Sequence, residues 1–357
     1  MADLYIRPVG RLGLPSSAPA PEGIRIAGRS ELLFAAAELI ERSGHGIERR
    51  TLAARDLLGG GAMRGATELL DRLLRPRPPI AGLSFDRPRI MGVVNVTPDS
   101  FSDGGLHFSH RDAIEHGLRL ESEGADILDV GGESTRPGAE PVDIEEESRR
   151  VLPVIEGLAG TVRIPISIDT RNADVMRRAA QAGARIINDV SALSHDPESL
   201  AVAAASGLPV VLMHARGTPG TMQRNPDYDD VVLDVYDALQ ARILACEQAG
   251  IPRARLIVDP GIGFGKTLAH NLALLGGLST FHGLGCAVLL GASRKSFIGK
   301  LTGAAADDRL PGSLAAALTG VAQGVQIIRV HDVAATRQAI MVWRGSEAGQ
   351  ASTIDRA

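Results

Sequence analysis

The sequence predicts an α/β fold, a (β/α)8 TIM barrel preceded by an N-terminal, mainly helical extension. From Arg89 onward, short apolar runs alternate with amphipathic stretches of helix length. The runs are continuously apolar, as in the buried strands of parallel sheets. Polar residues follow nearly every run, whereas an open doubly wound sheet usually carries one glycine-rich turn after its first strand. This pattern favours a barrel whose loops all face one site.

The extension comprises residues 1–87 and contains a stiff proline-rich break at residues 75–79. Ser30 can cap an amphipathic helix, whose apolar face would carry Leu32, Leu33, Ala36, Leu39 and Ile40. Residues 66–74 indicate a second helix. Nothing in the extension carries recognisable chemistry, so we expect residues 1–87 to be dispensable for catalysis.

The barrel is expected over residues 88–343, followed by a polar C-terminal tail over residues 344–357 that frays. Helices are predicted between the strands, for example over residues 171–183 and 229–250. The eight predicted strands cover residues 90–96, 126–130, 164–168, 185–188, 210–213, 256–258, 288–291 and 326–330.

The composition argues against nucleic acid and membranes as partners of this protein. The formal net charge is -4 and 22% of the residues are charged, which gives no basic face for nucleic acid or an anionic membrane. The N-terminus lacks the pattern of a signal peptide, and no run reaches the ~18 apolar residues of a membrane helix, so a cytoplasmic location is expected. Cys246 and Cys286 lack metal-site spacing and are expected to be buried and inert.

Carboxylates, amides and cations stand at the predicted strand ends, which a barrel brings to one concave mouth. Asn95 lies inside an apolar strand, where an unpaired amide would cost ~1–3 kcal/mol. This combination of carboxylates, amides and cations indicates a ligand with a hydrogen-bonding ring, which Asp169, Asn188 and Asp259 would bind. An anion joined to that ring would be held by Arg136, Arg329 and His331, because barrels commonly bind phosphate after strands seven and eight.

Residues 259–267 look like a phosphate loop, but Pro260 stands where the Walker spacing requires glycine. The NTPase interpretation is therefore rejected. Neither a Ser-His-Asp arrangement nor histidine-rich metal spacing stands out, which disfavours covalent acyl chemistry.

Two loop sequences resemble those of dihydropteroate synthases: VNVTPDSFSDGG at residues 94–105 and DVGGESTRPG at residues 129–138. Further segments resemble the family in the same order, and the resemblance spans about residues 88–343. They are SIDT (167–170), IND (187–189), LMH (212–214), DPGIGFGK (259–266), SRKS (293–296) and RVHD (329–332). The chain departs from the family pattern at Ala215-Arg216 and in its long N-terminal segment.

The resemblance implies condensation of 6-hydroxymethyl-7,8-dihydropterin diphosphate with p-aminobenzoate to 7,8-dihydropteroate and diphosphate, in folate biosynthesis. It implies a pterin site formed by Asp169, Asn188, Met213, Asp259, Phe264 and Lys295. Arg329 and His331 would bind the diphosphate, with Asn95 near a Mg2+ ion. Thr135, Pro137, Lys295 and Ser296 would border the p-aminobenzoate site, where sulfonamides compete in the family. Asp169, Lys295 and Arg136 are the candidate catalytic residues, and a homodimer is one expectation because dimers are common in the family.

Two alternatives remain at this stage. A pterin-dependent methyltransferase barrel would not be expected to keep the STRPG loop or the SRKS segment. A non-catalytic pterin-binding paralogue would have lost turnover, and the intact pair of loops argues against it.

Overall fold

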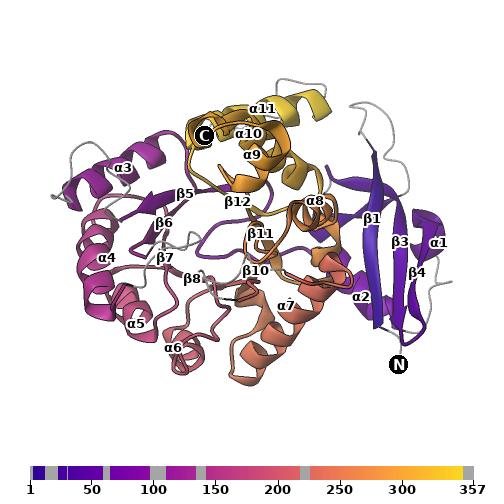
Figure 1. Ribbon diagram of the computed structural model, residues 1–357, viewed down its shortest axis with the longest axis horizontal. Coiled ribbons are helices and arrows are strands. Elements are labelled where there is room, and N and C mark those ends of the chain that lie inside the picture. Colours follow the sequence, from indigo (N-terminus) through magenta and orange to yellow (C-terminus); the bar gives the residue numbers. More distant parts are fainter. Residues whose placement is uncertain are drawn as a thin grey trace.

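The computed structural model describes residues 3–12, 23–29, 31–58, 65–96, 110–133, 142–217 and 226–348. These residues form a closed barrel of eight parallel strands and a separate four-stranded antiparallel sheet. In Figure 1 a ring of helices surrounds the barrel, and the small sheet lies to one side of it, near α7 and α8. The predicted TIM barrel is confirmed.

The barrel strands follow the chain order around the ring, and β9 and β10 pair in parallel like the other neighbours. Every predicted strand agrees with the structure to within two residues at each end. The strands are β5 (Arg89–Asn95), β6 (Ile127–Gly131), β7 (Ile166–Asp169), β8 (Ile186–Asp189), β9 (Val210–Met213), β10 (Leu256–Asp259), β11 (Ala287–Gly291) and β12 (Ile327–Val330).

Local capping sets the start of several barrel helices. The Asp143 side chain accepts from the Glu146 amide at the start of α4, and Asp230 accepts from the Val232 and Leu233 amides at the start of α7. The α-helices are α3 (His110–Ser122), α4 (Ile144–Ala159), α5 (Ala173–Ala182), α6 (Ser199–Ser206), α7 (Val231–Gln248), α8 (Leu268–Gly276), α9 (Ser296–Thr302), α10 (Leu310–Ala322) and α11 (Val333–Ala348). Short 3-10 helices are η3 (Arg253–Arg255), η4 (Leu278–Leu284) and η5 (Ala306–Asp308).

The last helix corrects the predicted tail, because α11 continues to Ala348 and residues 344–348 are helical. Arg11 of the extension explains part of the difference. Its guanidinium pairs with Glu347 and lies 5.1 Å from the centre of the Trp343 ring. A cation near the indole and an ion pair one turn later both favour an ordered helix end.

Strand alternation divides the apolar side chains of the barrel into two groups. Met91, Ile127, Ile186, Val211 and Ile257 belong to a cluster inside the barrel, to which Ile80 and Phe85 also belong. Their strand neighbours, such as Ile90, Leu128 and Ile187, belong to the larger cluster beneath the helices. Because side chains alternate between faces along a strand, residues two positions after the inner group also face the lumen.

The predicted N-terminal helix over residues 32–40 is wrong. Those residues belong to β3 (Leu33–Ser43), which pairs antiparallel with β1 (Asp3–Leu12), β2 (Ile24–Arg25) and β4 (Gly46–Ala53). Leu33, Phe34, Leu39 and Ile40 are all buried, although they point to both faces of the strand. A strand buried on both faces loses the two-residue alternation, and its apolar spacing then resembles that of a helix.

The extension is therefore mainly a sheet, and its helices are short. They are η1 (Ile26–Gly28), α1 (Ala54–Leu58) and α2 (Ala66–Leu74), the last of which confirms the second predicted helix. Pro8 lies within β1, where an edge strand tolerates the missing amide donor.

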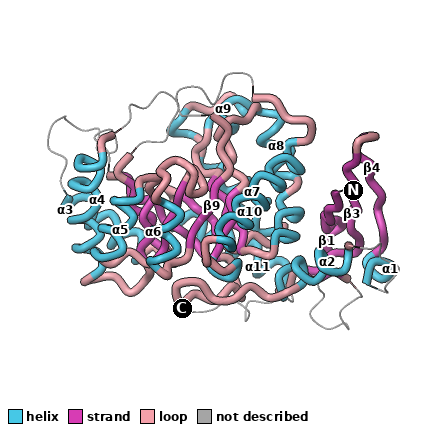
Figure 2. The backbone as a smooth tube through the Cα atoms, turned by 90° about the horizontal axis from the view of Figure 1, so that it is seen from below, coloured by secondary structure: helices cyan, strands magenta, loops and turns pink. Residues whose placement is uncertain are grey.

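The sheet lies at one side of the barrel in Figure 2, and β1 packs against η4. The Tyr5 hydroxyl donates to Asp237 of α7 at 2.9 Å, and Ser279 of η4 donates to the Pro8 carbonyl at 3.0 Å. Arg77, after α2, donates to the carbonyls of His282 and Cys286 at 2.8 Å each. These buried contacts make the extension part of the same folded body.

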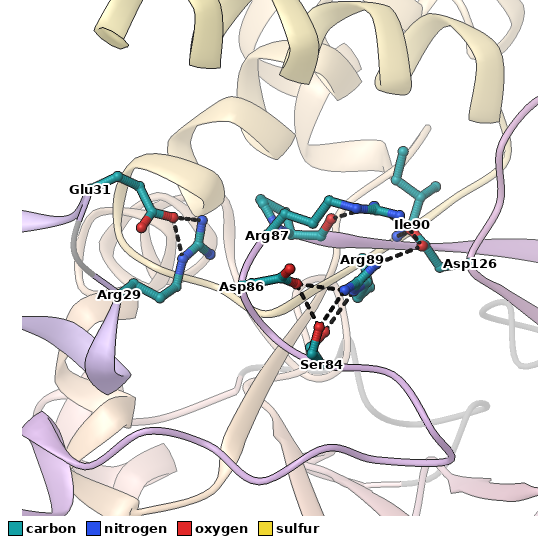
Figure 3. Close-up of polar contacts among 9 residues, drawn as sticks. Arg29, Glu31, Ser84, Asp86, Arg87, Arg89, Ile90 and Asp126 are labelled. Carbon is teal, nitrogen blue, oxygen red and sulfur yellow. Dashed lines mark hydrogen bonds and ion pairs between the residues drawn. The ribbon is translucent and has the colours of Figure 1, made fainter. Parts of the chain in front are cut away.

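At the amino-terminal end of the barrel, Asp126 is surrounded by donors, as Figure 3 shows. Arg87 donates to both of its oxygens, at 2.7 and 3.1 Å, and Arg89 donates at 3.2 Å. The backbone amide of Ile90 also donates to Asp126, at 2.9 Å. This group lies at the start of β5 and β6, at the end of the barrel away from the predicted site.

None of the helices in the described part of the chain is long and apolar enough to cross a membrane.

Candidate active site

A polar layer lies directly above the inner apolar layer of the barrel. Ile127, Ile186 and Ile257 are each followed two positions later by a polar residue with the same orientation. The same spacing places Asp129, Asn188, Asp259 and Arg329 in this layer, and it places the apolar Met213 beside them. The pairing register supports this layer, because Asn188 lies beside Asp169, and Met213 lies beside Asp259. The structure thus brings most of the predicted ring site together.

Arg329 of β12 crosses the lumen to two carboxylates. Its Nε donates to Asp129 Oδ2 at 2.6 Å and its Nη2 donates to Asp169 Oδ2 at 2.7 Å. Burial disfavours the charge of Arg329, but Asp129 and Asp169 outweigh burial and raise its pKa. Burial raises the pKa of Asp169 to about 7, against the effect of Arg329 and with the help of Asp129. The result is a compact group of opposite charges at the bottom of the mouth.

Asn188 ends the inner face of β8 and joins the same group. Its Nδ2 donates to Asp129 Oδ2 at 3.0 Å. Asp129 is fully buried, and its other oxygen, Oδ1, has no hydrogen-bond partner among the described residues. Asp129 therefore holds a side chain of β8 and a side chain of β12 through one oxygen atom.

Asp259 and Lys295 form the other side of the pocket. Asp259 Oδ1 accepts from the Gly261 amide at 2.8 Å, which fixes the carboxylate at the end of β10. Lys295, the residue before α9, donates to the Ile262 carbonyl, and its Nζ lies 4.5 Å from the centre of the Phe264 ring. Burial lowers the pKa of Lys295 to about 8 while Asp259 raises it, and burial raises the pKa of Asp259 while Lys295 lowers it. The two groups are thus electrostatic partners.

The loop after β10 needs glycine at two close approaches. Gly261 has a φ of +69°, and a Cβ there would lie 1.9 Å from the His214 carbonyl oxygen. Gly265 has a φ of +63°, and its Cβ would lie 2.5 Å from the Arg216 carbonyl oxygen. No other residue fits at these positions, so the loop that carries Phe264 packs tightly on the segment after β9.

Lys266 fastens this loop from outside the lumen. Its buried Nζ lies 3.0 Å from His214 Nδ1, 3.3 Å from the His214 carbonyl and 2.9 Å from the Phe264 carbonyl. Three acceptors match the three donors of an ammonium group. Burial lowers the pKa of Lys266 to about 7, and burial together with Lys266 lowers the pKa of His214 to about 3.

The remaining predicted residues lie around the rim. His331 follows β12, and its Nδ1 lies 3.0 Å from Ser293 Oγ. Ser296 begins α9 and is exposed. Asn95 ends β5 beside Gly131 of β6. Thr135, Arg136 and Pro137 lie outside the described residues, so their predicted roles stay predictions.

Within the described residues, no group of three or more carboxylate, imidazole or thiol side chains is arranged to hold a metal ion. Asn95 has a lumen-facing position four residues after Met91, at the mouth. A single amide oxygen fits an ion that takes its other ligands from phosphate and water, as Mg2+ commonly does.

Two participants were missed from the sequence, Asp129 and Lys266. The signal for Asp129 was present, because a carboxylate in the middle of an apolar strand needs a partner for the same reason as the Asn95 amide. Its partner Arg329 lies 200 residues away in the chain, so only the fold could identify it. Lys266 appeared only within the rejected phosphate-loop motif and the DPGIGFGK segment, without a role of its own.

Comparison with known proteins agrees with this geometry. A family model described as "Pterin binding enzyme" matches residues 91–331. The chain is 51% identical over 260 residues to the dihydropteroate synthase of Escherichia coli, covering 73% of this chain and 92% of that protein.

Two solved structures of dihydropteroate synthase from Xanthomonas albilineans are also similar. One, with 4-aminobenzoic acid, has a TM-score of 0.71 and 53% identity, over 75% of this chain and 97% of that chain. The other, in complex with 7,8-dihydropteroate, has a TM-score of 0.68 and 50% identity, over 74% of this chain and 96% of that chain.

Proposed function

The chain belongs to the family of pterin-binding enzymes, and on that basis we propose that it is a dihydropteroate synthase. It condenses 6-hydroxymethyl-7,8-dihydropterin diphosphate with p-aminobenzoate and releases diphosphate. The observation that carries the proposal is the polar layer of the lumen, where Asp169, Asn188 and Asp259 gather beside Lys295 and Arg329. The chain is 51% identical to the Escherichia coli enzyme over most of that enzyme's length.

The polar layer suits a pterin ring. The carboxylates of Asp169 and Asp259 accept from ring N–H and amino groups, and Lys295 donates to a ring oxygen or nitrogen. Met213 beside Asp259 and Phe264 beside Lys295 supply apolar walls for the flat ring. The ring then lies above the apolar layer with its methylene group toward the mouth.

The reaction breaks the bond between the methylene carbon and the diphosphate oxygen and forms a bond from that carbon to the arylamine nitrogen, which loses a proton. Positive charge develops on the pterin as the diphosphate leaves. Asp169 and Asp129 place negative charge beneath the ring, where preorganised groups stabilise such charge most effectively. Arg329 holds these carboxylates in place and reaches the lumen from β12, the strand before His331.

The diphosphate would lie near the ends of β11, β12 and β5, between His331 and Asn95. Asn95 would share a Mg2+ ion with the diphosphate, and the bound ion would neutralise charge on the leaving group. Thr135, Pro137, Lys295 and Ser296 would border the p-aminobenzoate. A homodimer stays a prediction.

Release of diphosphate on adding p-aminobenzoate to enzyme and pterin diphosphate tests the proposal. Steady-state release, with dihydropteroate formed in equal amount, supports it. Binding of the pterin without release would indicate a non-catalytic paralogue, and methyl transfer from a methylated pterin would indicate the methyltransferase alternative.

A further inference from the structure

Asp129 is fully buried in the middle of β6 and faces the lumen beneath the site. Its Oδ2 accepts from Arg329 Nε at 2.6 Å and from Asn188 Nδ2 at 3.0 Å. Within the part of the chain that the structure describes, its Oδ1 has no hydrogen-bond partner. Buried polar atoms are nearly always hydrogen-bonded, so a carboxylate kept in this position needs a reason beyond packing.

The contact between Asp129 and Asn188 fixes which way the amide faces. A carboxylate paired with a guanidinium can only accept hydrogen bonds, so the amide must present its NH2 group to Asp129. The carbonyl oxygen of Asn188 then lies on the opposite side of the amide carbon. Among the described residues, the hydrogen bond to Asp129 is the one found for this side chain, and none goes to its oxygen. Asn188 lies beside Asp169 in the barrel, so its free oxygen is close to the predicted ring site.

Building on the proposed function, we propose that Asp129 is a positioning residue. By orienting the Asn188 amide, it determines which edge of the pterin ring can hydrogen-bond to Asn188. By holding the NH2 group, it makes Asn188 an acceptor for a ring N–H or amino group. With Asp169 and Asp259, the site then presents three acceptors to one ring. It favours a heterocycle whose edge donates hydrogen bonds, such as a 2-amino-pyrimidinone, over one whose edge carries a carbonyl group.

An amide at position 129 removes this constraint with little change in shape. Asp129→Asn can donate as well as accept, so Asn188 can rotate and present either group. Asp126→Asn is the matched control, because Asp126 is also buried, also paired with arginine and only three residues earlier. It lies at the other end of the barrel and contacts no amide side chain (Figure 3).

The measurement is calorimetric affinity for two phosphate-free ligands, 6-hydroxymethylpterin and its 2-oxo counterpart, 6-hydroxymethyllumazine. The wild-type protein should prefer the amino compound. Asp129→Asn should reduce this preference about tenfold, the size of one hydrogen bond. Asp126→Asn should leave the preference within about twofold, a change too small for one lost hydrogen bond.

A double-mutant cycle separates positioning from simple structural damage. Asn188→Leu should reduce the preference as Asp129→Asn does, and the double variant should be no less selective than Asn188→Leu alone. If Asp129→Asn weakens both ligands by the same factor and leaves their ratio unchanged, the proposal is wrong. A wild-type protein that binds neither ligand would instead contradict the proposed function.

A measurement on the wild-type protein keeps the proposal testable if Asp129→Asn does not fold. In NMR spectra, the side-chain NH2 protons of Asn188 should be protected from solvent exchange before any ligand is added. Protection that appears only with the pterin would show that the NH2 group faces the ligand, which would overturn the proposal.

Discussion

Nη2 of Arg329 lies 2.7 Å from Oδ2 of Asp169, so a cation expected at the diphosphate is bonded to a carboxylate expected at the ring. The two halves of the substrate site are therefore coupled. A change at either residue should affect both halves.

Arg329→Ala should weaken both pterin ligands, but to different extents. For the pterin diphosphate, loss of a charge-assisted contact should raise the dissociation constant about tenfold to a hundredfold. For the phosphate-free alcohol, the rise should be about threefold to tenfold, because Asp169 and Asp129 lose their buried cation. Calorimetry on both ligands measures the difference, and added salt should shrink only the diphosphate-specific part. Asp259→Ala is the comparison, because it should weaken the binding of both ligands by the same factor. If Arg329→Ala weakens only the binding of the diphosphate, the ion pair is unimportant for binding of the ring.

Affinity for the phosphate-free pterin should fall as the pH falls through about 7. Burial raises the pKa of Asp169 to about 7, so below this pH the carboxyl group takes up a proton. A ring N–H can donate only to the ionised form, so proton and ligand compete, and affinity should fall by up to tenfold per pH unit below the pKa. Asp169→Asn should bind weakly and lose this dependence. A wild-type affinity that stays flat between pH 5 and 8 would contradict the prediction.

Leu73→Ala should reduce stability and leave catalysis nearly intact. Leu73 of α2 is fully buried in the core where the extension meets the barrel, and Leu-to-Ala changes in such positions cost about 2–5 kcal/mol. Urea unfolding should report this loss, while kcat/KM stays within about tenfold, a barrier change of ~1.4 kcal/mol. Removal of residues 1–80 goes further, because it removes β1 and α2, which pack against the buried η4, and we expect an insoluble product. A soluble truncated protein with full stability would show that the extension contributes nothing to the core.

Lys266→Met should impair catalysis without lowering the melting temperature. The substitution removes the ammonium that joins His214 to the Phe264 loop, so kcat/KM should fall about tenfold to a hundredfold as the pterin wall loosens. Stability should hold or rise, because burying an ammonium is costly. The pKa of His214 should move up from about 3, since Lys266 helps burial to lower it, and an NMR titration can follow that change. Lys300→Met, on the exposed side of α9, is the control and should change none of these quantities.

The barrel was predictable because its signals are local. Each strand is a continuous apolar run that ends in a polar residue, and Asp169, Asn188 and Asp259 stand at such ends. The shared orientation of these side chains follows from the alternation along parallel strands, so their convergence could be predicted before the structure was known.

The extension and Asp129 depended on non-local contacts. Strand β3 pairs with β1, about forty residues earlier, as in Asp3 with Arg42, and that pairing overrides the helical spacing of its leucines. From the sequence, Asp129 stands out only as part of a motif, because its function in the site comes from Arg329 and Asn188. Sequence patterns identify which residues end a strand, but not which of them share a hydrogen bond.

The ion pair between Arg11 and Glu347 joins β1 to α11. The two residues lie 336 positions apart in the sequence, so β1 can complete its contacts only after Glu347 has emerged from the ribosome. The antiparallel sheet can form early, since its strands are close in sequence, but its barrel-facing side stays uncovered until η4 and α11 arrive. We expect the nascent chain to rely on chaperones during this interval, and the completed protein to resist proteolysis at its N-terminus only once α11 has folded.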